Sequence, residues 1–256
     1  MLNFNHKPTL SERLTSLIDE ALQAERQTTR RDYLGASRLG VACDRALQYE
    51  YLHAPVDKGR TLKGQTLRIF AAGHVFEELA ANWLRLAGFA LFTETENGQQ
   101  YGFNVAGGRI RGHIDGIIAA GPQLAELAAG KYPALWETKS LNSKSWKDTV
   151  RKGVTLSKPV YAAQIALYQA YMEQQVPGIS QNPALFTAIN KDTAELYFEW
   201  VPFNGELAQR SSDRGVKIIT ASDADELLPR ATADRAWFGC KFCPWQDRCW
   251  QEIDGR

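Results

Sequence analysis

Charged side chains in two otherwise apolar segments place the strongest constraint on how this chain can fold. Asp115 lies in the apolar run 114–118, and Glu137 directly follows the apolar run 134–136. A carboxylate in a buried strand is tolerated only when it is paired or bound to a metal ion. Glu137 and Lys139 are two residues apart, so on a strand they point to the same face. If the two segments form neighbouring strands, these three charged groups meet at one edge of a sheet.

Two interpretations of these residues are open. In the first, Asp115 and Glu137 hold a hard divalent cation, and the Lys139 ammonium polarises a water molecule or a phosphate oxygen. In the second, Asp115 occupies a turn, and Glu137 and Lys139 form a solvated pair on the surface of a strand. The apolar surroundings of both carboxylates favour the first interpretation.

A long helix predicted over residues 65–87 contains a further candidate ligand. At 100° per residue, Phe70, Ala81 and Leu84 lie within about 40° of Glu77 on the helical wheel, and His74 lies at the margin of this apolar arc. A carboxylate on the buried side needs a metal ion or a basic partner. Glu77 is therefore a candidate metal ligand, His74 is a second one, and a buried salt bridge is the alternative.

Hydrophobic periodicity predicts strands and helices along the rest of the chain. Strands are predicted over 99–106, 109–119, 133–140, 184–190 and 194–201, and helices over 9–25, 158–175 and most of 204–235. Gly107-Gly108 predicts a hairpin turn between the first two strands. Thr9 and Glu12 resemble a capping box at the start of the first helix, whose apolar residues we expect to pack.

Two polar residues of the helix predicted over 158–175 lie on the same helix face. Gln164 and Tyr168 are four residues apart, so their side chains are neighbours on the helix surface. Such a pair usually packs in a core. It can also form hydrogen bonds with a phosphate or a nucleic acid base.

A basic segment follows the Glu-x-Lys triplet. It contains Lys139, Lys144, Lys147, Arg151, Lys152 and Lys158, with Asp148 as the single acidic residue. A solvated loop is one interpretation. The other is a rim that contacts DNA phosphates through Lys144, Lys147, Arg151 and Lys152, with Trp146 able to stack on a base.

The four cysteines are unevenly distributed. Cys240, Cys243 and Cys249 form a C-x2-C-x5-C run near the end of the chain, and Cys43 is far from them in sequence. Without an export signal, disulfides are not expected. Four thiolates complete the ligand set of a tetrahedral zinc ion or an iron–sulfur cluster. Three clustered ligands and one distant ligand suit a [4Fe–4S] cluster better than zinc; a chain without a metal, with Cys43 as a lone buried thiol, is the third alternative.

Composition excludes few functions. The 256 residues include 44% hydrophobic and 23% charged residues, which is ordinary for a globular domain. No apolar run approaches the length of a membrane span, so we expect a cytoplasmic protein without a membrane partner. The formal net charge of +1 neither favours nor excludes a nucleic acid partner, because local patches matter more than the sum.

Together these motifs resemble the RecB-like branch of the PD-(D/E)XK nucleases, in particular the Cas4-like and AddB-like proteins with a four-cysteine iron–sulfur cluster. The resemblance extends from Ser37 to Cys249. The corresponding motifs are the first-cysteine segment 37–49, the helical motif 73–78, the segments 112–115 and 136–139, the QxxxY element Gln164-x3-Tyr168, and the C-terminal cysteine triad. Many relatives have a metal-binding histidine four residues after the glycine of the helical motif, where this chain has Glu77. The third motif begins with Glu137 rather than aspartate, a variation that the family allows.

The resemblance implies an α/β fold with a restriction-endonuclease-like core, in which helices flank a central mixed sheet. It divides one compact unit into an N-terminal helical region (1–64), a nuclease core (65–203) and a C-terminal helical region (204–256), and the cluster joins the two helical regions. It also implies an Mg²⁺- or Mn²⁺-dependent exonuclease that acts on DNA ends in recombination, replication or repair. Such a stand-alone nuclease is of the kind found in bacteriophage genomes or near CRISPR loci, in a bacterial or phage-infected cell, where it can work with recombination or replication proteins.

In this interpretation Asp115, Glu137, the carbonyl of Thr138, and Glu77 or His74 bind the cation. Lys139 orients or deprotonates the attacking water or stabilises developing charge, and Gln164 and Tyr168 position the DNA strand. Two alternatives stay open: a non-catalytic DNA-binding or adaptor protein that keeps the fold, and a zinc-stabilised interaction module. The oligomeric state does not follow from the sequence.

Overall fold

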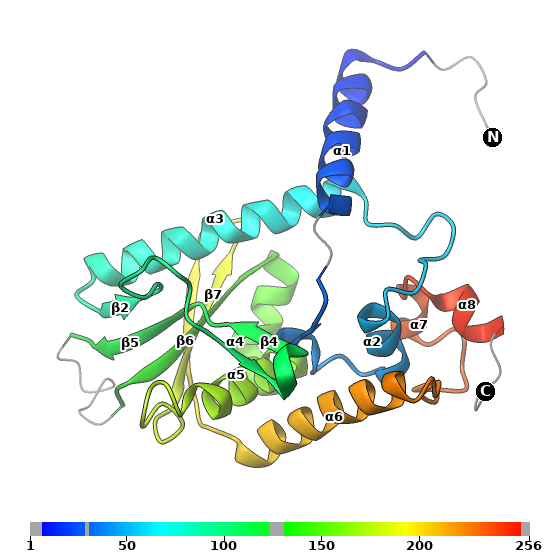
Figure 1. Cartoon of the computed structure of the whole chain (residues 1–256). Helices are drawn as coiled ribbons and strands as arrows, with labels where there is room; N and C mark the ends of the chain where they lie inside the picture. Colours follow the sequence, from blue (N-terminus) through cyan, green and yellow to red (C-terminus); the bar gives the residue numbers. More distant parts are fainter. Residues whose placement is uncertain (1–6, 29–30, 123–130, 252–256) are drawn as a thin grey trace.

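The computed structural model describes residues 7–28, 31–122 and 131–251 (Figure 1). Its longer helices are α1 (Leu10–Thr28), α2 (Asp44–Tyr51), α3 (Gly64–Leu86), α4 (Ser143–Ser157), α5 (Pro159–Met172) and α6 (Gly205–Asp223); α7 (Phe238–Lys241) and α8 (Gln246–Gln251) are short, as are two 3-10 turns at Ala36–Arg38 and Ala106–Gly108. The strands are β1 (Leu34–Gly35), β2 (Ala90–Phe92), β3 (Gly102–Val105), β4 (Ile110–His113), β5 (Gly116–Ala120), β6 (Ala134–Leu141), β7 (Ala184–Asn190) and β8 (Leu196–Val201).

A mixed five-stranded sheet forms the centre of the molecule, with the strand order β2-β5-β6-β7-β8. β6 and β7 are parallel, and the other neighbours are antiparallel. Helices α4 and α5 connect the parallel pair, because parallel strands need a long crossover. A smaller sheet with the order β1-β4-β3 lies beside it.

Helices cover both faces of the central sheet. On one face Ala81 and Leu84 of α3 pack with Trp136 of β6 and Ile118 of β5. On the other face, Ile165 of α5 belongs to a second, larger core. That core contains Leu135, Ala184, Phe186 and Ala188 from the strands. The predicted mixed sheet flanked by helices is confirmed.

The predicted strand over 109–119 is divided in the structure. β4 pairs with β3 in the small sheet, whereas β5 pairs with β2 and β6 in the central sheet. Ile114 and Asp115 form the link between the two sheets, where the Ile114 amide donates to the Tyr101 carbonyl. Asp115 therefore precedes a strand of the central sheet instead of ending one.

Several further expectations differ from the structure. The helix predicted over most of 204–235 ends at Asp223, and most of the apolar residues of the first helix, which were expected to pack, are exposed. Residues 143–157 form helix α4, where the sequence predicts a solvated loop or a basic rim. Its start is capped by Asn142, whose Oδ1 accepts a hydrogen bond from the Ser145 amide (2.8 Å). Phe70, placed on the buried arc of α3, is half exposed, because the sheet covers only the second half of that helix.

Helix α2 and the segment that follows it lie beside α7 and α8 (Figure 1). The Asp57 amide donates to the Pro244 carbonyl (2.9 Å), and the Trp245 indole donates to the Ala54 carbonyl (2.9 Å). Arg60 donates to the Lys241 carbonyl (2.6 Å). The boundaries at residues 64 and 203 stay a prediction. Within the described ranges, no helix combines the length and apolarity that crossing a bilayer requires.

Candidate active site and cysteine cluster

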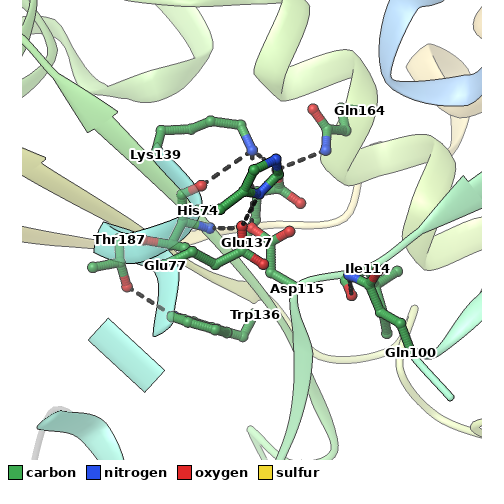
Figure 2. Close-up of polar contacts among 11 residues, drawn as sticks. His74, Glu77, Gln100, Ile114, Asp115, Trp136, Glu137, Lys139, Gln164 and Thr187 are labelled. Carbon is green, nitrogen blue, oxygen red and sulfur yellow. Dashed lines mark hydrogen bonds and ion pairs between the residues drawn. The ribbon is translucent and has the colours of Figure 1, made fainter. Parts of the chain in front are cut away.

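Asp115 lies directly before β5 and beside β6, the middle strand of the central sheet. The Thr138 amide donates to Asp115 Oδ2 (2.8 Å), so the carboxylate is tied to the strand that contains Glu137 and Lys139. Gln100 Nε2 donates to the Ile114 carbonyl (3.1 Å) and holds the peptide that precedes Asp115. Figure 2 shows Asp115, Glu137 and Lys139 directed toward one another.

Glu137 is fully buried on the α5 side of the sheet. Its Oε1 accepts a hydrogen bond from Gln164 Nε2 (2.6 Å) and pairs with the Lys139 ammonium. Its Oε2 is also buried and has no hydrogen-bond partner among the described residues. A buried carboxylate oxygen without a partner is unfavourable, which makes it a position where a cation would bind.

Lys139 connects the acidic groups. Besides Glu137, its Nζ donates to the Thr138 carbonyl (3.1 Å) and lies 3.8 Å from Asp115 Oδ2. The ammonium also lies 5.5 Å from the centre of the Tyr161 ring, at a distance typical of a cation–π contact. Burial alone would lower the pKa of Lys139, but the charges of Glu137 and Asp115 outweigh it and raise that pKa above its ordinary value.

Helix α3 contributes Glu77 and His74. His74 Nδ1 lies 3.7 Å from Glu77 Oε2, with the histidine side chain 80% exposed and the glutamate 31% exposed. Glu77 is close enough to Asp115 for the two charges to interact. Between the two candidates, Glu77 is therefore the one that the fold directs toward the carboxylates, and His74 lies beside it at the surface (Figure 2).

Burial and the negative charges of neighbouring carboxylates raise the pKa values of Glu137 and Glu77. Burial and then the charge of Asp115 raise the pKa of Glu137 to about 8. Burial and the same Asp115 charge also raise the pKa of Glu77. Three neighbouring acids with a single lysine between them form a site with excess negative charge when all are ionised. A divalent cation would relieve this repulsion, and carboxylate oxygens are the ligands that Mg²⁺ and Mn²⁺ prefer.

The donor set therefore fits the implied cation, although the side chains are not arranged around one. Within residues 7–28, 31–122 and 131–251, no group of three or more His, Cys, Asp or Glu side chains is placed as it would be around a metal ion. The Thr138 carbonyl, a further expected ligand, accepts its hydrogen bond from Lys139.

Gln164 and Tyr168 lie inside the protein. Gln164 contacts Glu137, so it orients a candidate ligand. Tyr168 is 3% exposed and packs edge-on against Phe103, with ring centroids 5.3 Å apart. Gln164 is thus brought into the site through Glu137, and the predicted contact of both side chains with DNA stays a prediction.

The structure brings the four cysteines into one neighbourhood. Cys43 precedes α2, Cys240 lies in α7, Cys249 lies in α8, and Cys243 follows α7. Burial and the charges on the other three cysteines raise the pKa of Cys243 to about 11, although the hydrogen bond from the Trp245 backbone lowers it. Four thiols in one neighbourhood are the donors that an iron–sulfur cluster needs. In the described part of the chain, however, no three of them are placed as they would be around a metal ion, and the [4Fe–4S] cluster stays a prediction.

Two arginines lie against this group. Arg45, which is fully buried, donates to the Leu228 carbonyl (2.5 Å) and lies 3.8 Å from Cys249 Sγ. Arg230 donates to the Cys249 carbonyl through Nε (3.0 Å) and Nη2 (2.7 Å). Arg45 belongs to the first-cysteine segment 37–49 of the family resemblance. Arg230 was not predicted, because nothing in its sequence context indicates this contact.

The basic residues of segment 144–158 lie on or beside α4. They border a groove of about 690 Å³ lined by Asn142, Lys144, Ser145, Lys147, Asp148, Arg151 and Lys158. Arg151 and Lys152 pair with Asp148 (2.9 and 2.8 Å). Trp146 packs against the core, and its Nε1 donates to the Ala188 carbonyl (3.2 Å), an arrangement that does not suit the predicted stacking on a base.

Comparisons with known proteins show a similarity of fold to solved structures, without a match in sequence. No protein-family model matches the chain, and no curated protein matches it by sequence. The solved structure of SSO0001 is similar, with a TM-score of 0.51 and 17% identity over 96% of this chain and 100% of that one. An alkaline exonuclease (LHK-Exo) from Laribacter hongkongensis gives a TM-score of 0.49 at 14% identity, covering 80% of this chain and 93% of that one. Its complex with dAMP gives 0.47 at the same identity and coverage. These last two scores are too low to support an inference, and the first supports the fold alone.

Proposed function

We propose that this protein is a metal-dependent DNA nuclease whose centre contains Asp115, Glu137, Lys139 and Glu77. The observation that supports this most directly is the buried Glu137 Oε2, which has no hydrogen-bond partner in the described part of the chain. It lies in a group of acids in which the charges of Asp115 and Glu77 act on Glu137. A purely structural ion pair would not need this surplus of carboxylates.

The residues have distinct roles in the proposed reaction. Asp115, Glu137, the Thr138 carbonyl and Glu77 would hold one or two cations, with His74 as a further candidate. A bound Mg²⁺ or Mn²⁺ would lower the pKa of a water molecule and neutralise charge on the scissile phosphate. Lys139, which contacts Glu137 and lies 3.8 Å from Asp115, would stabilise the charge that develops on the phosphate. Gln164 would hold Glu137 in place.

The groove along α4 is the proposed path of the DNA backbone, because it begins directly after β6 and is lined by lysines. Lys144 and Lys147 are exposed, and such side chains bind phosphates without reading sequence. Action at a free DNA end, in recombination, replication or repair, rests on the family resemblance. Cys43, Cys240, Cys243 and Cys249 would hold a [4Fe–4S] cluster, which would supply a covalent link between the two ends of the chain.

A cleavage assay with end-labelled DNA tests the proposal. The purified protein is incubated with single- or double-stranded DNA in the presence of Mg²⁺, Mn²⁺ or EDTA, and the products are separated by length. We expect cleavage that EDTA abolishes, with products that show the polarity. Asp115→Asn and Lys139→Ala should each lower the rate by about 10³-fold or more, with unchanged circular dichroism.

Neighbouring residues of α3 provide a matched control. Glu77→Gln should impair cleavage, whereas Glu78→Gln should not, because Glu78 is an exposed residue of the same helix. Full activity of both Asp115→Asn and Lys139→Ala would refute the assignment. DNA binding without cleavage on every substrate would favour the adaptor alternative, and a colourless protein that contains zinc and does not cleave DNA would favour the interaction module.

A further inference from the structure

Helix α1 has an apolar stripe that the rest of the described chain leaves exposed. Leu10 is 73% exposed, Leu14 50%, Leu17 61% and Ile18 51%. Figure 1 shows α1 projecting from the body beyond one end of α3. Its start is well defined by the capping box, in which the Thr9 amide donates to Glu12 and the Glu12 amide donates to Thr9 Oγ1. A stable helix that presents so many large apolar side chains is expected to be covered by a partner.

The contact with α3 uses the opposite side of α1. Asp19 pairs with Arg68 of α3, and Gly64 packs directly against Asp19. Within residues 7–26 the half-buried side chains are those of Asp19, Leu22 and Gln23, and the others are exposed. The fold thus fixes α1 through one face and leaves its leucine stripe directed away from α3.

The stripe has the spacing of a coiled-coil seam. Leu10, Leu14, Leu17, Ala21 and Ala24 alternate in steps of four and three residues, as the a and d positions of a heptad do. The 19 residues of α1 would give a seam about 28 Å long. Another α-helix is therefore the shape that fits this stripe.

Charge decides which class of partner fits. In α1 the four acids Glu12, Asp19, Glu20 and Glu25 exceed the two bases Arg13 and Arg26, which leaves a net charge of −2. A helix of this charge repels DNA and anionic lipid surfaces. The stripe is suited to a protein partner instead.

We propose that α1 pairs with α1 of a second copy of this chain in an antiparallel coiled coil. With Leu14 opposite Leu17 of the second copy, Arg13 and Glu20 occupy the flanking positions that face each other across the seam. The twofold symmetry of such a pair forms this contact twice. A parallel pairing would place Glu20 opposite Glu25 of the second copy, and like charges there disfavour association.

Sedimentation measurements on the full chain, over a range of about 1 to 100 µM, test the proposal. We expect a monomer–dimer equilibrium that Leu14→Asp and Leu17→Asp each shift to monomer throughout this range. Arg13→Glu and Glu20→Arg should each weaken the dimer by about tenfold, because like charges then meet twice. The double variant Arg13→Glu/Glu20→Arg should recover to within about threefold of the native chain.

Two matched variants separate the seam from general surface effects. Leu86→Asp changes another exposed leucine (86%) at the end of α3, and Arg210→Glu reverses a charge on α6; neither should alter the equilibrium. Circular dichroism confirms that each variant is folded. A native chain that stays monomeric over the whole range overturns the proposal. So does a dimer that persists in the Leu14→Asp and Leu17→Asp variants, or a double charge variant that fails to recover.

Discussion

Glu137 shows how one buried side chain can be held for chemistry. Gln164 and Lys139 both contact its Oε1, while its Oε2 has no hydrogen-bond partner within the described residues. One oxygen is thus oriented by the protein, and the other is the position that we propose for the cation. Such supporting contacts to a metal-binding side chain commonly affect activity by about 10- to 100-fold.

We therefore predict that Gln164→Ala lowers the rate of DNA cleavage by about 10- to 100-fold, because Glu137 loses the donor that orients it. Single-turnover cleavage with saturating Mn²⁺ measures the effect. The variant should still bind DNA, since Gln164 is buried and is not among the residues that line the α4 groove.

Gln169 on the same helix gives the control for this prediction. It is also buried, but its Nε2 donates to the carbonyls of Ile179 (2.9 Å) and Asn182 (2.8 Å). Gln169→Ala should lower the free energy of unfolding by about 1–3 kcal/mol and leave single-turnover cleavage unchanged at a temperature where the variant is folded. Equal losses of activity in the two variants would contradict the role assigned to Gln164.

At the scale of elements, α4 connects β6, which contains the proposed catalytic residues Glu137 and Lys139, to the groove that we propose for DNA. It follows β6 after a single residue, Asn142, and is interrupted at Gly153 (φ 74°, ψ 163°). A side chain at Gly153 would meet Glu199 Oε1 at 2.9 Å. Glu199 also accepts a hydrogen bond from the Val154 amide (2.7 Å), so it caps the helical turn that resumes after the break. Lys144 and Lys147 therefore lie in the continuous part of the helix that precedes the break.

We predict that Lys144→Ala and Lys147→Ala each weaken DNA binding similarly for all sequences. Each should also reduce the slope of log Kd against log salt concentration by about 1, because a phosphate contact and its released counterion are lost. Fluorescence anisotropy with EDTA present, to prevent cleavage, measures both quantities.

Arg210→Ala on α6 is the control, because Arg210 pairs with Glu206 outside the groove. An unchanged salt slope in both lysine variants would place the DNA path elsewhere.

At the scale of the whole molecule, polar contacts hold the early and late parts of the chain together. Asp44 of α2 pairs with Arg214 and with Lys217 (3.0 Å) of α6. Burial raises the pKa of Asp44, but the hydrogen bonds and charges of Lys217 and Arg214 outweigh it, so that this pKa lies below its ordinary value.

A lowered pKa means that the ion pairs stabilise the fold above the unfolded-state pKa of about 3.9 and lose this effect as the pH falls further. We predict that Asp44→Asn lowers the free energy of unfolding by about 1–2 kcal/mol at pH 7. The difference from the native chain should shrink as the pH falls below about 4. Urea unfolding at several pH values measures it, and a difference independent of pH would contradict the assignment.

The proposed cluster gives a second prediction at this scale. Cys243→Ser should abolish the bound iron and sulfide and the visible absorption of anaerobically purified protein, because one of four ligands is lost. Both ends of the chain should then become more sensitive to limited proteolysis, since the cluster closes nearly the whole chain. Met172→Leu, a change of similar size in the core, provides the control. A native chain without iron would refute the cluster.

Local patterns in the sequence were sufficient for most elements and for the list of candidate residues. The capping box before α1, strand β6 and the alternation of Glu137 and Lys139 depend on neighbours within a few residues, so periodicity predicts them. Helix α4 was not predicted. Asn142 as a cap and the spacing of Trp146, Thr149 and Val154 are consistent with a helix, but the many basic residues of this segment are equally typical of a solvated loop.

Contacts between distant segments were decided only by the tertiary structure. The break at Asp115 arises because β4 and β5 join different sheets, and Gln164 reaches Glu137 only because α5 packs on β6. The outward direction of the α1 stripe depends likewise on Asp19 meeting Arg68 of α3. The free energy of burying or pairing a side chain depends on neighbours that are remote in sequence. Sequence alone therefore determined which groups are available, and folding determined which of them meet.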